Sequence, residues 1–279
     1  MTILNILAMG DTHSFGQCGL TPRDFMLSTG SKVELNFVQK YLHDCFDHMV
    51  DQLPDVLHAV FLNGDLCEGI NPAERGRGIC EPDPDTQARG FIKLMMPILR
   101  RIPMCGNNLP VFIQRGTSYH AGKGGSTPEA IGQALRAPLD AYGHATTYWR
   151  QVKIGNILFD LAHQQTVSRT SKSAGLEKEI GHYFERIGRN HEVAEDKVIF
   201  LRSHIHVGYK QYCEQNAMGI SLPAWKVQDD FMQSRIDPNR MVPENLGSVL
   251  IQIEPETQSV HLVPYLYDHP RIEAKEYYA

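Results

Sequence analysis

Residues 3–13 read ILNILAMGDTH, a mostly apolar run that ends directly in Gly10, Asp11, Thr12 and His13. The run Ile3–Met9 is short and rich in Ile and Leu, which predicts a buried β-strand. The same pattern, an apolar strand with Asp or His in the segment that follows its carboxyl end, returns four more times along the chain. This repetition points to an α/β fold, because ligands of such proteins bind at the carboxyl ends of the sheet strands.

The four later strands end in the same kinds of residue. The predicted strands are 56–62, 111–114, 156–161 and 198–201, and the side chains that follow them include Asp65, His120, His163, His204 and His206. Residues i and i+2 of an extended segment point the same way, roughly 6–7 Å apart. Asp11 with His13, and His204 with His206, are therefore each expected to present two donors toward one point.

Carboxylate and imidazole donors together predict a metal site. This donor set favours Mn, Zn, Fe or Ni over Mg or Ca, since imidazole is a borderline-soft ligand. In two-metal sites the ions lie about 3.5–4 Å apart. Asp65 stands at the end of the second strand and suits the carboxylate that bridges two ions. We therefore predict two divalent ions as cofactors. Part of the content of 13 histidines in 279 residues would then belong to this site.

Helices and hairpins fill the rest of the chain. Apolar spacing and end signals predict helices over residues 32–53, 87–101 (interrupted or bent near Pro97), 128–136 (with Thr127 as N-cap) and 176–190. Hairpins are expected from 146–153 with 156–161, turning at Gly155-Asn156, and from 207–213 with 218–222, before a last pair, 248–253 with 259–266. The order predicts an α/β protein whose second half contributes a further sheet. No compositional break marks a linker, so we predict a single domain over residues 1–279.

Composition excludes several protein classes. The chain is 42% hydrophobic and 21% charged with a net charge of −5, which argues against disorder and against a general affinity for nucleic acid or anionic membranes. No apolar run reaches the roughly 18 residues that span a bilayer, and we expect no membrane partner. The six cysteines form no C-x-x-C pair, which favours a reduced, cytoplasmic protein.

Taken in chain order, the strand-end motifs resemble those of calcineurin-like metallophosphoesterases. The matching motifs are D-x-H (Asp11, His13), G-D (Gly64, Asp65), a lone His (His163) and H-x-H (His204, His206). The resemblance covers roughly residues 3–207. It implies a four-layer sandwich of two mixed β-sheets flanked by helices. It also implies that one ion is held by Asp11, His13 and His206, that Asp65 bridges, and that the other ion is held by His163 and His204.

The third motif departs from the family pattern. The family has Gly-Asn-His-Asp or Gly-Asn-His-Glu after this strand, where Asn is a metal ligand and His an acid. Here the segment is Gly116-Thr117-Ser118-Tyr119-His120, a Gly-Thr-x-x-His form that resembles phage-type members. Thr117 stands where Asn is expected, and a hydroxyl is a poorer ligand. His120 lies two residues beyond the family His, so it acts either as the catalytic acid or as a replacement ligand.

The resemblance implies hydrolysis of a phosphomonoester or phosphodiester by a metal-bridging hydroxide. The expected partner is a phosphate-ester substrate, with nucleotides and nucleic acid among the options, and Arg115 and Arg169 are expected to bind its phosphate oxygens. A nuclease for short or single strands is a second hypothesis, since the acidic balance argues against extended duplex binding. Two further hypotheses are a metal-dependent hydrolase of non-phosphate esters and a non-catalytic scaffold, which only Thr117 supports. The oligomeric state stays open.

Overall fold

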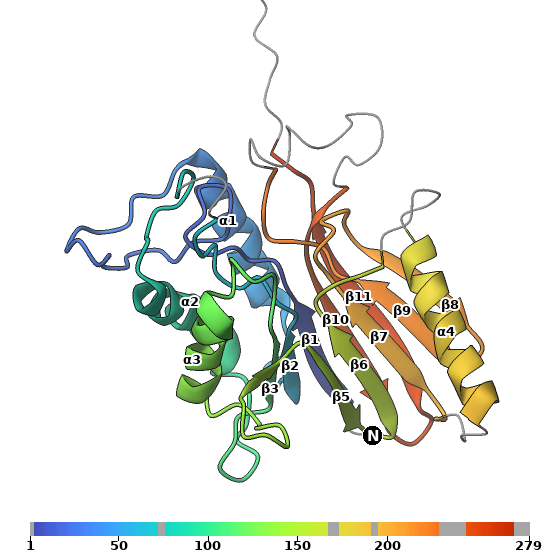
Figure 1. The fold of residues 1–279 in the computed structure, drawn as a ribbon. Coiled ribbons are helices and arrows are strands. Elements are labelled where there is room, and N and C mark those ends of the chain that lie inside the picture. The colour runs from blue at the N-terminus through green and yellow to red at the C-terminus, as the bar shows by residue number, and fades with distance from the viewer. Residues whose placement is uncertain (1–2, 72–75, 167–172, 191–194, 229–243, 271–279) are drawn as a thin grey trace, which may run out of the picture.

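Two mixed β-sheets pack face to face and carry helices on their outer sides (Figure 1). The computed structural model describes residues 3–71, 76–166, 173–190, 195–228 and 244–270. The first sheet has the strand order β11 (Ser259–Tyr267), β10 (Leu246–Glu254), β1 (Leu4–Met9), β2 (Ala59–Leu62), β3 (Val111–Gln114) and β4 (Thr146–Thr147). The second has the order β5 (Trp149–Ile154), β6 (Ile157–Ala162), β7 (Val198–Arg202), β9 (Ala217–Ser221) and β8 (Lys210–Glu214).

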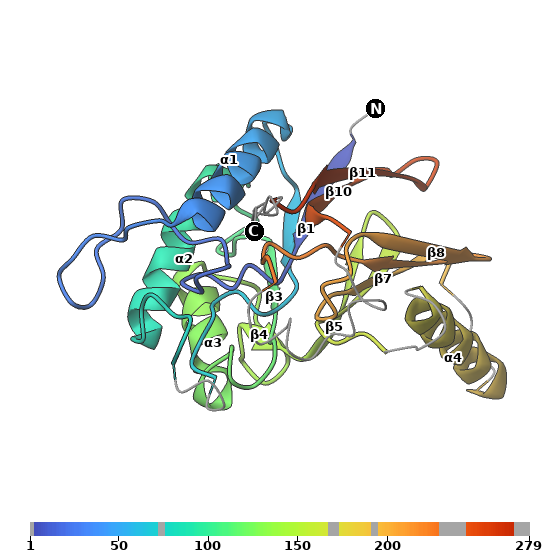
Figure 2. The same cartoon turned by 90° about the horizontal axis from the view of Figure 1, so that it is seen from above.

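Parallel strands form the centre of both sheets. Strands β1 to β4 run parallel to one another, as do β6, β7 and β9, while β10, β11, β5 and β8 pair antiparallel at the edges. The helices α1 (Phe37–Gln52), α2 (Pro84–Leu99) and α3 (Ser126–Ala134) cover the first sheet, and α4 (Ala174–Asn190) covers the second (Figures 1 and 2). The predicted fold class, four layers with two mixed sheets inside, is confirmed.

Strand β1 shows why its sequence is apolar without alternation. Leu7 and Met9 belong to the core under the helices, whereas Ile6 and Ala8 belong to the core between the two sheets. All four side chains are fully buried. A strand buried on both faces is expected to read as a continuous hydrophobic run. This central strand therefore anchors the edge at which Asp11 and His13 follow.

Two helices begin at other residues than the apolar spacing predicts. Helix α1 begins at Phe37 and not at residue 32, because Asn36 and Gln39 form a capping box in which each side chain accepts from the other's amide. Helix α2 begins at Pro84, where Asp83 caps it, and runs through Pro97 to Leu99. The helix is continuous at Pro97, so it is not interrupted there.

The third helix also corrects a prediction. Helix α3 starts at Ser126 directly after a short 3-10 turn, Lys123–Gly125. Its N-cap is Gly125 and not Thr127, because Thr127 already lies in the first turn of the helix. The Thr127 amide donates to the carbonyl of Ala121.

The hairpin predicted over residues 146–161 divides between the two sheets. Thr146–Thr147 is β4 of the first sheet, and only Trp149–Ile154 pairs with β6. The predicted turn at Gly155-Asn156 is confirmed, since both residues have positive φ, as a two-residue hairpin turn requires. The chain thus crosses from one sheet to the other at Tyr148. The prediction of a single domain stays a prediction.

No helix in the described part of the chain combines the length and the apolar character that crossing a bilayer requires.

Candidate metal centre

The carboxyl ends of the parallel strands meet at one edge, where main-chain hydrogen bonds hold their loops together. The amide of Asp11 donates to the carbonyl of Gly64 at 2.9 Å, and that of His13 donates to the carbonyl of Asp65 at 3.0 Å. On the second sheet, the amide of Ser203 donates to the carbonyl of His163 at 2.9 Å. These bonds tie the loop after β1 to the loop after β2, and the loop after β7 to the loop after β6, and these four loops carry the predicted ligands.

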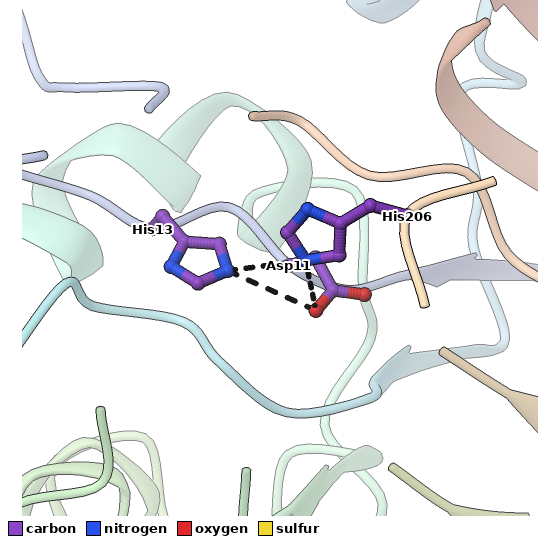
Figure 3. A group of neighbouring side chains, drawn as sticks. All are labelled: Asp11, His13 and His206. Carbon is purple, nitrogen blue, oxygen red and sulfur yellow. Dashed lines mark hydrogen bonds and ion pairs between the residues drawn. The ribbon is translucent and has the colours of Figure 1, made fainter. Parts of the chain in front are cut away.

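The first group of ligand atoms comes from Asp11, His13 and His206 (Figure 3). His206 Nε2 lies 3.0 Å from Asp11 Oδ1 and 3.3 Å from His13 Nε2. The third side of this triangle, from His13 Nε2 to Asp11 Oδ1, measures 3.9 Å. All three side chains are buried. Residues from opposite ends of the chain thus converge on one point.

A second group consists of Asp65, His163 and His204. His163 Nε2 lies 3.1 Å from Asp65 Oδ2, and the rings of His163 and His204 are 5.1 Å apart. The two groups are neighbours, since His13 Nε2 lies 4.0 Å from Asp65 Oδ2. A third group joins His13 and Asp65 to His120. Six predicted ligands and His120 therefore gather in one place.

The backbone brings these side chains together in a way that the extended-strand argument does not predict. Eleven non-glycine residues among those described have positive φ, and five of them are predicted ligands: Asp11, His13, Asp65, His204 and His206. Residues i and i+2 are therefore not extended here. Asp11 and His13 do meet in one group, but the expectation that His204 and His206 share one point is wrong, because they join different groups. Such strain is typical of functional sites.

The arrangement fits divalent metal ions. Nitrogen and oxygen ligands lie about 2.0–2.2 Å from zinc, which places two ligands of one ion roughly 3–3.5 Å apart. The separations of 3.0 Å and 3.3 Å around His206 Nε2 match this spacing. The buried Nε2 of His163 makes no hydrogen bond to the described residues, although it lies close to the Asp65 carboxylate. These buried groups could hold metal ions; their number and identity belong to the proposals below.

Hydrogen bonds fix which ring nitrogen faces the site. His163 Nδ1 donates to the carbonyl of Asn63 at 2.7 Å, and His13 Nδ1 lies 3.1 Å from the Glu68 carboxylate. His120 Nδ1 donates to the main-chain carbonyl of Glu68. With Nδ1 engaged, the Nε2 lone pair is directed at the site, as in proteins whose metal-ligating histidines are oriented by outer hydrogen bonds.

Charge also favours a cation at this place. Burial raises the pKa of Asp11, but the nearby His206 and His163 outweigh it and hold that pKa below its ordinary value. Burial lowers the pKa of His163, yet the carboxylates of Asp65 and Asp11 raise it to about 9. The two carboxylates thus attract positive charge. A metal ion would take the place of the imidazolium proton, since metal binding to His requires the neutral ring.

Two glycines leave room for the ligands. A Cβ on Gly64 would lie 2.4 Å from the His163 ring, and a Cβ on Gly116 would lie 1.9 Å from Asp65 Oδ1. Any other residue at these positions would displace a ligand.

Thr117 has a role that the sequence alone does not indicate. Its amide donates to Asp65 Oδ1 at 2.7 Å, and its hydroxyl lies 3.0 Å and 3.1 Å from the two carboxylate oxygens. Thr117 stands at the position of the family's Asn ligand, but here it orients the carboxylate that is predicted to bridge. The motif's departure is therefore compatible with an intact site.

A buried ion pair lies behind His13. Lys226 Nζ donates to both oxygens of Glu68 at 3.1 Å and 3.2 Å, and both side chains are buried. The sequence is compatible with Glu68 either as an orienting residue or as a solvated loop residue, and the structure places it against His13. Sequence patterns do not reveal Lys226, because 158 residues separate it from Glu68. No local pattern signals such a pair.

Replacing Lys226 with Met is expected to destabilise the fold by about 3–5 kcal/mol, because it leaves the Glu68 carboxylate buried without its counter-charge. Urea denaturation of the chelated protein measures this loss. The double variant Glu68→Gln with Lys226→Met serves as the control and should recover most of the stability. A single variant as stable as the wild type would show that the pair is not needed.

Of the two arginines predicted to bind substrate, the structure describes Arg115. Arg115 Nε donates to Thr146 Oγ1 at 2.9 Å, its Nη2 lies 3.6 Å from the Glu129 carboxylate, and its guanidinium lies 5.5 Å from the centre of the Tyr148 ring. A phosphate contact by Arg115 stays a prediction. Arg169 lies outside the described residues.

Comparisons with known proteins give distant structural likenesses. Neither protein-family models nor curated proteins yield a match to the sequence. An uncharacterized Streptococcus pneumoniae protein, described as a predicted phosphoesterase, is 13% identical with a TM-score of 0.37, covering 96% of this chain and 94% of that one. Vacuolar protein sorting 29 (Vps29) of Cryptosporidium parvum is 12% identical with a TM-score of 0.42, covering 96% and 100%. Zn²⁺-complexed Vps29 of Entamoeba histolytica is 12% identical with a TM-score of 0.36, covering 94% and 99%.

The chain's own architecture and ligand order fit the calcineurin-like metallophosphoesterases. Two mixed sheets between helical layers, with Asp and His at the strand ends, are what the sequence resemblance implies. At these scores the structural likenesses carry no information on activity, which is argued below from the site itself.

Proposed function

We propose that this protein is a metal-dependent phosphoesterase that hydrolyses a phosphomonoester or a phosphodiester. The observation that carries the proposal is the pair of buried ligand groups that lie side by side and share one edge of the sheets. One ion would be held by Asp11, His13 and His206, and the second by Asp65, His163 and His204, with Asp65 as the bridge. Mn, Zn, Fe and Ni suit these donors.

When bound, a pair of divalent ions supplies a water of lowered pKa and stabilises negative charge on a phosphoryl group. The chain's own residues prepare the place for this chemistry. Thr117 holds the Asp65 carboxylate through its amide and hydroxyl. Asn63 and Glu68 hold His163 and His13 with Nε2 facing the site. The left-handed backbone at the ligands is maintained by the surrounding sheet edge, so little reorganisation is needed on binding.

Two arginines are proposed to recognise the substrate. Arg115 directly follows β3 and precedes Gly116, which lies against Asp65, and it is proposed to bind a phosphate oxygen. Arg169, in the loop after His163, is proposed for the same role. Nucleotides and short single strands belong among the candidate substrates. The scaffold hypothesis is disfavoured by the presence of all six predicted ligands (Asp11, His13, Asp65, His163, His204 and His206), since a site that is no longer used has no reason to keep them.

Activity toward synthetic esters tests the proposal. The chelated protein, supplied with Mn²⁺, is expected to hydrolyse bis-p-nitrophenyl phosphate, p-nitrophenyl phosphate or both, because these esters need little help from an acid. A parallel screen with oligonucleotides and p-nitrophenyl acetate separates nuclease and carboxylesterase activity from the proposed one. Mn²⁺ without protein, and chelated protein without Mn²⁺, are the controls. Bound metal without turnover of any phosphate ester would favour the scaffold.

A further inference from the structure

His120 is buried among the predicted ligands, and a main-chain carbonyl binds its Nδ1. Its side chain is only 6% exposed, and its ring packs edge-on against that of His13 at 4.3 Å between centroids. Its Nδ1 donates to the main-chain carbonyl of Glu68. A carbonyl oxygen can only accept, so Nδ1 carries the proton, and in the neutral ring Nε2 offers a lone pair.

The side chains grouped with His120 are themselves predicted metal ligands, His13 and Asp65. One donor atom each from His120, His13 and Asp65 lie within 4.8 Å of one another. With Nδ1 held by Glu68, the nitrogen of His120 that remains for this group is Nε2. The neighbouring donors, His13 Nε2 and Asp65 Oδ2, are 4.0 Å apart. Three donors around a common point form the kind of arrangement that the other two groups show.

Glu68 links His120 to the first group. Its carboxylate lies 3.1 Å from His13 Nδ1, while its main-chain carbonyl accepts from His120 Nδ1. One residue thus sets the proton position of both rings, so that both direct Nε2 toward the site. Lys226 in turn holds the Glu68 carboxylate in place. Hydrogen bonds of this kind orient the histidines that bind metal ions in proteins.

We propose that His120 is a metal ligand that this chain adds, through Nε2, to the ion held by Asp11, His13 and His206, and that it is not the proton donor. The inference rests on the proposed metal centre. The Thr117 hydroxyl is engaged with Asp65, so His120 is the residue of the third motif that supplies a strong donor. The first ion would then have five candidate ligands and the second only three, namely Asp65, His163 and His204. The two ions should bind with different affinities, and the less enclosed one would keep open positions.

Metal titration of the full-length protein tests this directly, with the metal alone as the probe. Chelated protein is titrated with Co²⁺ and followed by calorimetry and by visible absorption, which responds to the number and kind of ligands. We expect His120→Ala to weaken the tighter binding step by at least about tenfold and to change the cobalt spectrum. His120→Gln keeps a side-chain oxygen and should lie between His120→Ala and the wild type.

His43→Ala is the matched control. His43 is an equally buried imidazole, 5% exposed, on α1, where its Nε2 meets the carbonyl of Thr21 and none of the ligands. Its loss removes a similar volume from the interior but should leave both cobalt steps and the spectrum unchanged. If His120→Ala does not fold, as thermal unfolding of the chelated protein would show, His120→Gln carries the test.

Three other outcomes would contradict the inference, the proposed function or both. Unchanged cobalt affinity and spectrum in both His120 variants would overturn the inference, and loss of turnover on alkyl phosphates but not on p-nitrophenyl phosphate would then make His120 the acid. A wild-type protein that binds no cobalt would contradict the inference together with the proposed function. A wild-type protein that binds cobalt with the predicted dependence on His120, but hydrolyses no phosphate ester, would contradict the proposed function alone.

Discussion

Replacing Asp65 with Asn is expected to abolish phosphoesterase turnover, with a loss of at least about 10³-fold. Asp65 contributes to two of the three ligand groups, and Thr117 holds its carboxylate. An amide in its place removes a negative charge and turns one oxygen donor into an NH₂ group. Metal ions supply several kcal/mol of transition-state stabilisation, and each 1.36 kcal/mol corresponds to tenfold in rate. We expect the variant to lose bound metal as well. Steady-state kinetics measures the turnover, and elemental analysis of the same sample measures the metal content.

Asp160→Asn is the control for this variant. Asp160 is also a buried aspartate, 5% exposed against 4% for Asp65, but it accepts hydrogen bonds from Trp149 and Arg202, and belongs to none of the ligand groups. Its substitution should reduce stability while the folded protein keeps its metal and its turnover. An Asp65→Asn protein with wild-type metal content would contradict the assignment of Asp65 as a bridging ligand.

Gly116→Ala should have a comparable effect on the site although it replaces none of the predicted ligands. The added Cβ would lie 1.9 Å from Asp65 Oδ1 and 2.4 Å from the Asp65 amide nitrogen. Side chain and backbone of Asp65 must both move, so we expect loss of metal binding and a destabilisation of about 1–3 kcal/mol, the usual cost of overpacking. Calorimetric metal titration and thermal unfolding measure the two consequences.

Gly181→Ala gives the matched comparison. Gly181 lies within α4, and a Cβ there would meet no atom within 4 Å. Alanine is favoured over glycine in a helix by about 1 kcal/mol, so this variant should be slightly more stable than the wild type and should bind metal normally. Normal metal binding by Gly116→Ala would mean that the loop after β3 adapts, and that the tight approach to Asp65 is not required.

Much of the fold could be predicted, because hydrophobic patterning and strand ends depend on local sequence. The apolar run before Asp11 is buried on both faces and therefore reads plainly as a central strand. Helix starts are harder to predict, since the capping box at Asn36 and not the apolar spacing decides where α1 begins. The crossing between the sheets at Tyr148 leaves no signal, because both flanking segments have strand character.

The gathering of the site residues could be predicted, but not the way in which it is achieved. The ends of β1 and β2 in the first sheet and of β6 in the second bring Asp11, Asp65 and His163 to one place. The positive φ values of the ligands depend on tertiary contacts such as the His204 amide donating to Asp11 Oδ2 at 3.1 Å. Strand spacing does not predict that His204 and His206 join different groups; only the family resemblance implies that division. The Lys226–Glu68 pair depends on contacts of the same long-range kind.

Anomalous X-ray scattering from a crystal loaded with Mn²⁺ tests the central claim most directly. We expect two peaks about 3.5–4 Å apart at the carboxyl edge of the sheets. One is predicted beside Asp11, His13 and His206, and the other beside His163 and His204, with Asp65 between them. A crystal in which manganese scatters elsewhere, or in which these side chains hold no ion, would contradict it.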